Sequence, residues 1–227
     1  MAIRVVIERG PKGKRSVAFS LDWPGWSRGG KSRDLAIETL ESYRARYRPV
    51  ARLANMAREF DAAGPLKIVE DKVGTGSTDF WGISFSPASA ELGPMTDAEL
   101  ERGITLLRAC WTFFDDVALR VSPEMRTGPR GGGRDRDTII RHTIRNESEY
   151  FARRLGLRVP EYAAMTPEGL REHRKTYVAA MREYNAGEIK RMRTWTLPYL
   201  IRHSAFHTLD HAWEMEDKDL TGDGRAV

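Results

Sequence analysis

The stretch "TLPYLIRHSAFHTLDHAWEMED", residues 196–217, combines an apolar helical pattern with three of the five histidines in the chain. His203, His207 and His211 follow one another at intervals of four residues. In an α-helix a step of four residues turns by about 400°, so successive histidines differ by only about 40° around the axis. We therefore predict one helix, with Pro198 in its first turn, that presents His207 and His211 on one face.

Three further helices are predicted upstream, because apolar residues recur there every three or four positions between Gly- and Pro-rich segments. They cover residues 98–121, 138–156 and 167–186, with Thr96 or Asp97, Gly156 and Thr166 as caps and a loop at 122–137. Four helices joined in this way are typical of an antiparallel four-helix bundle. We place this domain at residues 93–227.

Residues 1–92 show a mixed pattern of strands and helix. The segments "IRVVIE" (3–8) and "RSVAFSL" (15–21) flank "RGPKGK" and predict an antiparallel hairpin. Further strands are expected at 64–74 and 78–86. Between them, the Gly-rich loop 22–32 leads to a helix over 33–60, which Ser32 caps and Pro49 kinks or divides. The expected fold class is α+β: a small N-terminal α/β module of antiparallel strands plus a helix, followed by the bundle.

The composition is that of an ordinary folded protein, with 41% hydrophobic residues in 227. No apolar run reaches the eighteen or more residues of a membrane span, and the charged start "MAIRVVIERGPKGKR" does not resemble a secretory signal. We expect a cytoplasmic protein with no membrane partner. Cys110 is the single cysteine, which excludes an intramolecular disulfide and a cysteine-built metal cage; among apolar neighbours it is expected to be buried.

The net charge of +5 raises the question of nucleic-acid binding. However, 37 basic residues are balanced by 32 acidic ones and are spread along the chain. The best candidate for a nucleic-acid contact is the pair Trp23 and Trp26, which lies beside Arg28 and Lys31. However, aromatic residues in a turn more often cover the edge of a core. We do not expect nucleic acid to be the principal partner.

Two histidines bind a metal ion weakly, so a third ligand is needed. His142 in "IIRHTIRNESEY" (139–150) is the candidate, because its isoleucine neighbours predict that part of this helix faces the core. Three imidazoles leave coordination positions for water or substrate, as in catalytic sites. Histidines on helices are also commonly solvated or hydrogen-bonded, and the spacing leaves both interpretations open. His173, within the charged run "REHRKTY", is expected to be exposed. For His203 three roles stay open: hydrogen bonding to a metal ligand, contact with a substrate, or a polar residue in the core.

Residues 96–220 resemble the DinB-like, also called YfiT-like, four-helix bundle family. The resemblance is carried by "IRHTIRNESEYFARRLG" (140–156) and "LIRHSAFHTLDHAWEME" (200–216), in this order. It implies a divalent metal ion, zinc or nickel, on His142, His207 and His211, with His203 outside the coordination sphere. It also implies a metal-dependent hydrolase, or a transferase or isomerase that uses a low-molecular-weight thiol, acting on a small molecule, and a homodimer. The family often has Gly-Gln after the last histidine, whereas this chain has Ala212-Trp213-Glu214. The resemblance therefore says less about the substrate pocket than about the metal ligands.

The segment "VAFSLDWPGWSRGGKSRDLAIETL" (17–40) is similar to HicB-like antitoxins, through its Pro-Gly turn, glycines and helix cap. This implies that residues 1–92 are a module for contacts with a protein partner, although the same prolines and glycines also serve simply to shape turns. The alternative to an enzyme is therefore a non-catalytic interaction or stress-associated protein, antitoxin-like and associated with a protein or a nucleic acid.

Few other residues offer chemistry. Glu214, one turn beyond His211, is a candidate to orient a ligand or to act as a catalytic base, or it simply belongs to the acidic run "EMEDKD". Arg141 and Arg145 flank His142 and are candidates to bind an anionic substrate or to be solvated. No GxSxG motif, P-loop or cysteine nucleophile is evident, so the enzyme hypothesis depends on the histidines.

Overall fold

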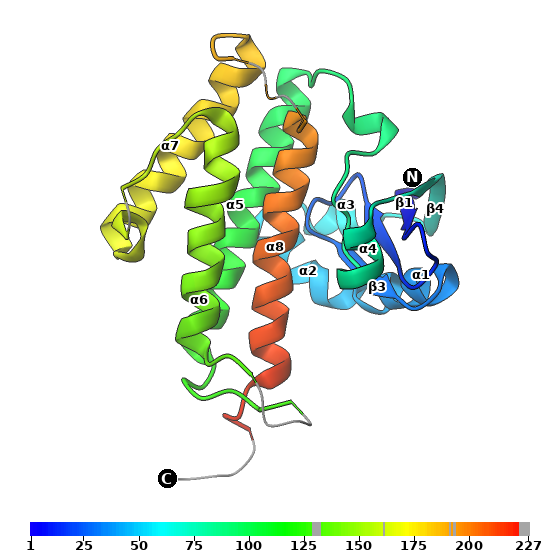
Figure 1. The fold of residues 1–227 in the computed structure, drawn as a ribbon, viewed down its shortest axis with the longest axis horizontal. Helices are drawn as coiled ribbons and strands as arrows, with labels where there is room; N and C mark the ends of the chain where they lie inside the picture. Colours follow the sequence, from blue (N-terminus) through cyan, green and yellow to red (C-terminus); the bar gives the residue numbers. More distant parts are fainter. Residues whose placement is uncertain (129–132, 161, 191, 193, 223–227) are drawn as a thin grey trace. The chain divides into compact units, whose positions relative to one another are not determined.

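The computed structural model describes residues 1–128, 133–160, 162–190, 192 and 194–222 and has the expected α+β class (Figure 1). The chain divides into two compact units. The first unit is Met1–Cys110 with Arg193–Phe206, and the second is Trp111–Met192 with His207–Val227. The division falls inside two long helices, α5 (Asp97–Arg120) and α8 (Leu197–Lys218). The predicted domains, 1–92 and 93–227, stay a prediction.

The first unit contains a four-stranded sheet in the order β3-β2-β1-β4. Its strands are β1 (Ile3–Arg9), β2 (Ser16–Ser20), β3 (Ser27–Gly30) and β4 (Leu66–Val73). The predicted hairpin is confirmed, because β1 and β2 pair antiparallel. The sheet is nevertheless mixed and not purely antiparallel as expected, because β4 pairs parallel to β1, with a register shift between Val5 and Val6.

Strand β3 lies inside the segment that we predicted to be a loop. Its two glycines explain the difference, since each allows a close approach of another backbone. A Cβ atom on Gly29 would lie 2.4 Å from the carbonyl oxygen of Gly82, and one on Gly30 would lie 2.5 Å from the amide nitrogen of Ala36. These glycines make room for neighbouring backbone, whereas the sequence pattern suggested a turn.

The predicted helix over 33–60 is three helices, α1 (Arg33–Ser42), α2 (Arg44–Leu53) and α3 (Ala57–Asp61). Ser32 caps α1 as expected, since its hydroxyl accepts the Leu35 amide at 3.2 Å. We predicted that Pro49 kinks or divides the helix; it does not divide it, because Pro49 lies inside α2, and the kink stays a prediction. The breaks fall at Tyr43 and at Asn55, whose φ of 59° is left-handed.

The predicted strand over 78–86 is also wrong: α4 (Gly76–Trp81) begins before it, and Gly82, with φ 70°, ends this helix. The aromatic residues that suggested a strand, Phe80 and Trp81, are mostly exposed. Thr78 and Asp79 of α4 are buried, and the Asp79 carboxylate accepts the backbone amides of Lys12 at 2.7 Å and Lys14 at 2.8 Å. A contact between segments 65 residues apart in the chain therefore favours helix here.

Trp23 and Trp26 are buried in an aromatic cluster of the first unit. Trp26 stacks on Tyr47 with ring centroids 5.7 Å apart, and Trp23 meets Phe60 edge-on at 4.9 Å. The indole N–H of Trp26 donates to the Leu40 carbonyl at 2.8 Å, so its polar atom is satisfied. These tryptophans thus belong to the core, and their buried rings are not available to stack on a nucleic acid.

Four long helices follow, as predicted. Thr96 and Glu99 form a capping box at the start of α5, with the Glu99 amide 3.2 Å from the Thr96 hydroxyl. The second unit holds α6 (Arg136–Arg145), a π-helical turn η2 (Asn146–Phe151), the 3-10 turns η3 (Ala152–Leu155) and η4 (Ala163–Met165), and α7 (Pro167–Ala186). Gly156, with φ 81°, and Thr166, which accepts the Gly169 amide, cap as predicted. Residues 129–132 of the predicted loop 122–137 lie outside the described residues.

Side chains from all four long helices meet within the second unit. Trp111 of α5 lies against Tyr177 of α7 with ring centroids 6.3 Å apart, and Arg120 of α5 pairs with Glu216 of α8. Helices α6 and α8 are in contact through histidine rings, as described below. Among the residues that the structure describes, no helix is both long and apolar enough to cross a membrane.

Candidate metal centre

Three histidines of the second unit come together, one from α6 and two from α8. One ring nitrogen of each, on His142, His207 and His211, lies within 4.8 Å of the others. The ring centroids are 4.6 Å apart for His207 and His211, 4.8 Å for His142 and His211, and 5.2 Å for His142 and His207. These are the three histidines that the sequence analysis singled out, and they form a group that could hold a metal ion.

The amphipathic pattern of α6 explains how His142 reaches this group. Asp135 caps the helix by accepting the Thr138 amide at 2.6 Å, and Ile139 and Ile144 are buried. His142 is accessible to solvent, whereas His207 is half-buried and His211 is buried. The group therefore extends from the interior of the second unit to its surface, where a water molecule or a substrate can approach.

The π-helical turn η2 begins four residues after His142 and has no counterpart in our sequence predictions. At its start the Asn146 side-chain amide donates to the His142 carbonyl at 2.8 Å and lies 3.4 Å from the Nδ1 of the His142 ring. At its end the Phe151 ring meets the His207 ring edge-on, with centroids 5.4 Å apart. A π-turn inside a helix is frequent at functional sites, and here it positions two neighbours of the histidines. The sequence carries no recognisable signal for it.

Glu214 fixes the orientation of His211. Its carboxylate lies 2.8 Å from His211 Nδ1 and accepts hydrogen bonds from Arg134 at 2.7 Å and Lys218 at 2.6 Å. A carboxylate on one ring nitrogen leaves the other nitrogen available to a metal and fixes the tautomer, as in many metal sites. The structure thus places Glu214 beside a histidine and not isolated in an acidic run.

The electrostatics favour a neutral imidazole at His142 and an ionised carboxylate at Glu214. Burial lowers the pKa of His142 to about 4, with further lowering from His211 and the positive charge of Arg134. Burial by itself would raise the pKa of Glu214, but hydrogen bonds from His211 and Lys218, together with Arg134, lower it to about 2. Only the neutral form of an imidazole can bind a metal, so His142 is in the competent state at neutral pH.

The donor set fits a divalent transition metal. Zinc and nickel both accept imidazole nitrogen. Zinc–nitrogen bonds of about 2.1 Å at the tetrahedral angle place two ligand nitrogens about 3.4 Å apart, so side-chain rotations that bring the nitrogens closer by up to about 1.4 Å are needed from the 4.8 Å spacing. Three histidines with no cysteine correspond to sites that keep positions for water or substrate.

The remaining histidines lie elsewhere. His203 is buried among aromatic rings of the first unit, with its ring centroid 5.2 Å from Trp195 and 5.4 Å from Tyr199. The expectation that His173 is exposed is wrong: it is 5% exposed, its Nε2 lies 3.2 Å from the Glu147 carboxylate, and its ring stacks on Tyr177. The charged run around it suggested a solvated face, but His173 lies on the inner side of α7. Cys110 is buried, as predicted, and burial raises the pKa of its thiol.

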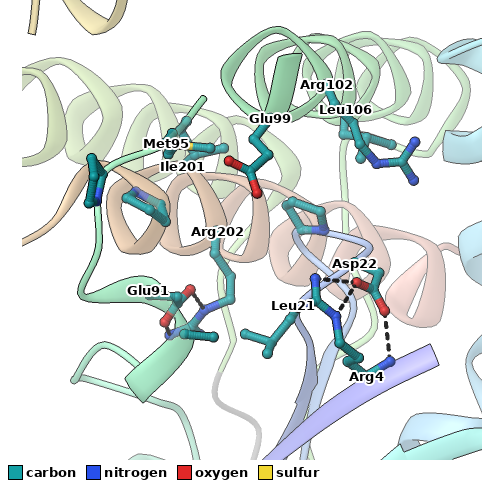
Figure 2. A pocket seen from close by; sticks show the side chains of 15 residues that line it. Arg4, Leu21, Asp22, Glu91, Met95, Glu99, Arg102, Leu106, Ile201 and Arg202 are labelled. Atoms are coloured by element: carbon teal, nitrogen blue, oxygen red, sulfur yellow. Dashed lines mark hydrogen bonds and ion pairs between the residues drawn. The ribbon is translucent and has the colours of Figure 1, made fainter. Parts of the chain in front are cut away.

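A separate cavity of about 190 Å³ lies in the first unit (Figure 2). Its charged side chains are paired with one another or with neighbours. Arg202 pairs with Glu91 at 2.5 Å, with both side chains buried, and Arg4 pairs with Asp22 at 2.7 Å. The Arg202 guanidinium also lies 3.8 Å from the centre of the Phe19 ring. This arrangement accounts for the charges of the cavity without a ligand, so we assign it a structural role.

No family model matches this chain, and no curated protein or solved structure matches it. Function is therefore inferred from the geometry of the three-histidine group and from the two histidine motifs in the sequence.

Proposed function

We propose that this protein is a metal-dependent enzyme of the DinB-like kind, a hydrolase or a transferase that uses a low-molecular-weight thiol. His142, His207 and His211 would hold zinc or nickel. The observation that carries the proposal is the convergence of their ring nitrogens within 4.8 Å, from two helices between which 51 residues of sequence lie (146–196). The order and spacing of the two histidine motifs, which resemble those of the DinB-like family, support it independently.

If a divalent ion is bound by the imidazoles of His142, His207 and His211, it would lower the pKa of bound water or of a thiol and so provide a nucleophile at neutral pH. The protein supplies the rest. His142 lies at the solvent-accessible side, where a small molecule can approach, and Glu214 holds the His211 ring through Nδ1. Arg134 and Lys218 hold Glu214 in turn, so the buried histidine is fixed by a chain of charge-assisted hydrogen bonds.

The first test is metal content by elemental analysis of protein purified without a histidine tag. The proposal predicts about one equivalent of a divalent metal, lost in His207→Ala and in His211→Ala. His203→Gln is the matched control, because it alters a histidine of the same helix outside the group and should retain the metal. A chain that carries no metal and does not take up added zinc would refute the proposal.

The second test is activity. The loaded protein is screened against ester and amide substrates, and against electrophiles in the presence of small thiols. Activity should be absent from His207→Ala and from His211→Ala, and adding metal ions to these variants should not restore it. If metal is bound and all these screens are negative, the enzymatic part of the proposal fails. The protein would then be the non-catalytic interaction protein that the HicB-like segment 17–40 suggests, and a protein partner of the first unit would be sought.

We further propose, from the same resemblances, that residues 1–92 contact a protein partner and that the chain forms a homodimer. Chemical crosslinking and light scattering of the purified protein test the second statement directly: a mass of one chain at all concentrations would contradict it.

A further inference from the structure

A groove of about 540 Å³ lies in the second unit on the solvent-accessible side of α6, and His142 forms part of its wall. Arg141, Arg145 and Glu149 line it from α6 and η2, and Tyr150 and Tyr162 contribute aromatic rings. Its volume is in the range of sites that take small organic molecules. The three-histidine group and this groove therefore share one residue.

The groove has an excess of positive charge. Arg145 is paired with Glu149, with its Nε 3.3 Å from the carboxylate. Within the described part of the chain, the exposed guanidinium of Arg141 donates to a neutral hydroxyl, Thr138 Oγ1 at 2.9 Å, and to no carboxylate. A guanidinium presents planar paired donors that match a carboxylate, so Arg141 is the position at which an anionic group of a ligand would be held.

The two tyrosines on the groove are unusually exposed for their size, Tyr150 at 61% and Tyr162 at 60%. Tyr162 also has a φ of 62°, a left-handed conformation that is strained for a bulky residue. Strained backbone of this kind persists where the surroundings impose it and is enriched at ligand sites. Flat aromatic faces next to a guanidinium are suited to a flat ring that carries a carboxylate.

We propose that this groove binds a small aromatic carboxylate, with Arg141 holding the carboxylate and the tyrosines lying against the ring. The inference rests on the proposed function in that it names the substrate class of the same site. It places the ring of the substrate beside His142, so that the group to be transformed would be a substituent of an aromatic acid.

The test uses benzoate as the probe and calorimetric titration of both zinc-loaded and chelator-treated protein. Benzoate should bind, and benzamide, which has the same shape without the charge, should bind at least about tenfold more weakly. Arg141→Gln should weaken benzoate binding by about tenfold, the loss expected for one charge-assisted contact. Arg153→Gln is the control, because Arg153 is an exposed arginine of η3 outside the groove, and this change should leave the affinity for benzoate unchanged. Cyclohexanecarboxylate should bind more weakly than benzoate, and Tyr162→Leu should abolish this preference.

The outcomes separate this inference from the proposed function. If zinc binds to the histidines but benzoate binds no better than benzamide, or Arg141→Gln has no effect, the groove assignment is refuted and the metal site stands. If benzoate binding depends on Arg141 in a protein that takes up no zinc, the anion site stands and the enzyme proposal is refuted. A circular dichroism spectrum of Arg141→Gln equal to that of the unmodified protein shows that the variant is folded.

Discussion

Replacing Glu214 by glutamine should weaken zinc binding without unfolding the protein. Glutamine keeps the size of the side chain but removes the negative charge that His211, Arg134 and Lys218 share at 2.6 to 2.8 Å. A hydrogen bond to a charged group contributes about 1.5 to 3 kcal/mol, and solvent reduces this for a half-buried carboxylate. Since about 1.4 kcal/mol corresponds to a factor of ten, we expect the Kd for zinc to rise by about 10- to 30-fold.

The assay is competition for zinc against a chromophoric chelator at neutral pH, with the folded fraction followed by circular dichroism. Glu216→Gln is the matched control, because Glu216 lies on the same helix and pairs with Arg120 of α5. A Kd for Glu214→Gln within twofold of that of the unmodified protein would refute the reasoning. Glu214 would then be a surface ion-pair partner of Arg134 and Lys218 with no effect on the orientation of His211.

Three further predictions concern the fold. Trp26→Ala, which empties a fully buried position, should lower the free energy of unfolding in urea by about 3 to 5 kcal/mol; a loss below about 1 kcal/mol would contradict the packing described for it. Burial would raise the pKa of Asp79, but the backbone amides of Lys12 and Lys14 outweigh it and lower the pKa. Because the folded pKa is depressed, Asp79 stabilises the fold above its unfolded pKa of about 3.9 and this contribution is lost as the pH falls through the folded value. Acid unfolding of Asp79→Asn should show a smaller change in stability across this range, and identical pH profiles would exclude the mechanism. Gly187→Ala should cost about 1 kcal/mol in thermal unfolding, because φ is 81° there and a Cβ would meet nothing within 4 Å, so backbone strain is the sole penalty.

The predictions of helix caps and of the hairpin were confirmed because these features depend on residues that are close together in the sequence. Helix caps at Ser32, Thr96 and Thr166 depend on a side chain and an amide three residues away, and the structure has each of them. The predicted hairpin of β1 and β2 likewise depends on a short turn between two apolar segments. The face shared by His207 and His211 follows from helix geometry, which the sequence contains once a helix is predicted.

The incorrect predictions concern segments whose structure depends on distant partners. The run 78–86 reads as a strand from its composition, yet Asp79 holds two amides of the β1–β2 turn and α4 forms. The segment 22–32 reads as a loop, yet its glycines allow other backbone to approach and β3 forms. Secondary-structure propensity is a weak preference that tertiary contacts can override, and this happened in both segments.

By itself, the sequence determined the α+β class, the four long helices and the helical spacing that places His207 and His211 on one face. Only the tertiary structure decided that His142 reaches them from another helix, that Glu214 contacts His211 and that His173 is buried. The physical reason is that periodicity and capping act within a few residues. The meeting of α6 with α8 depends on packing between segments some 60 residues apart, which no local pattern specifies.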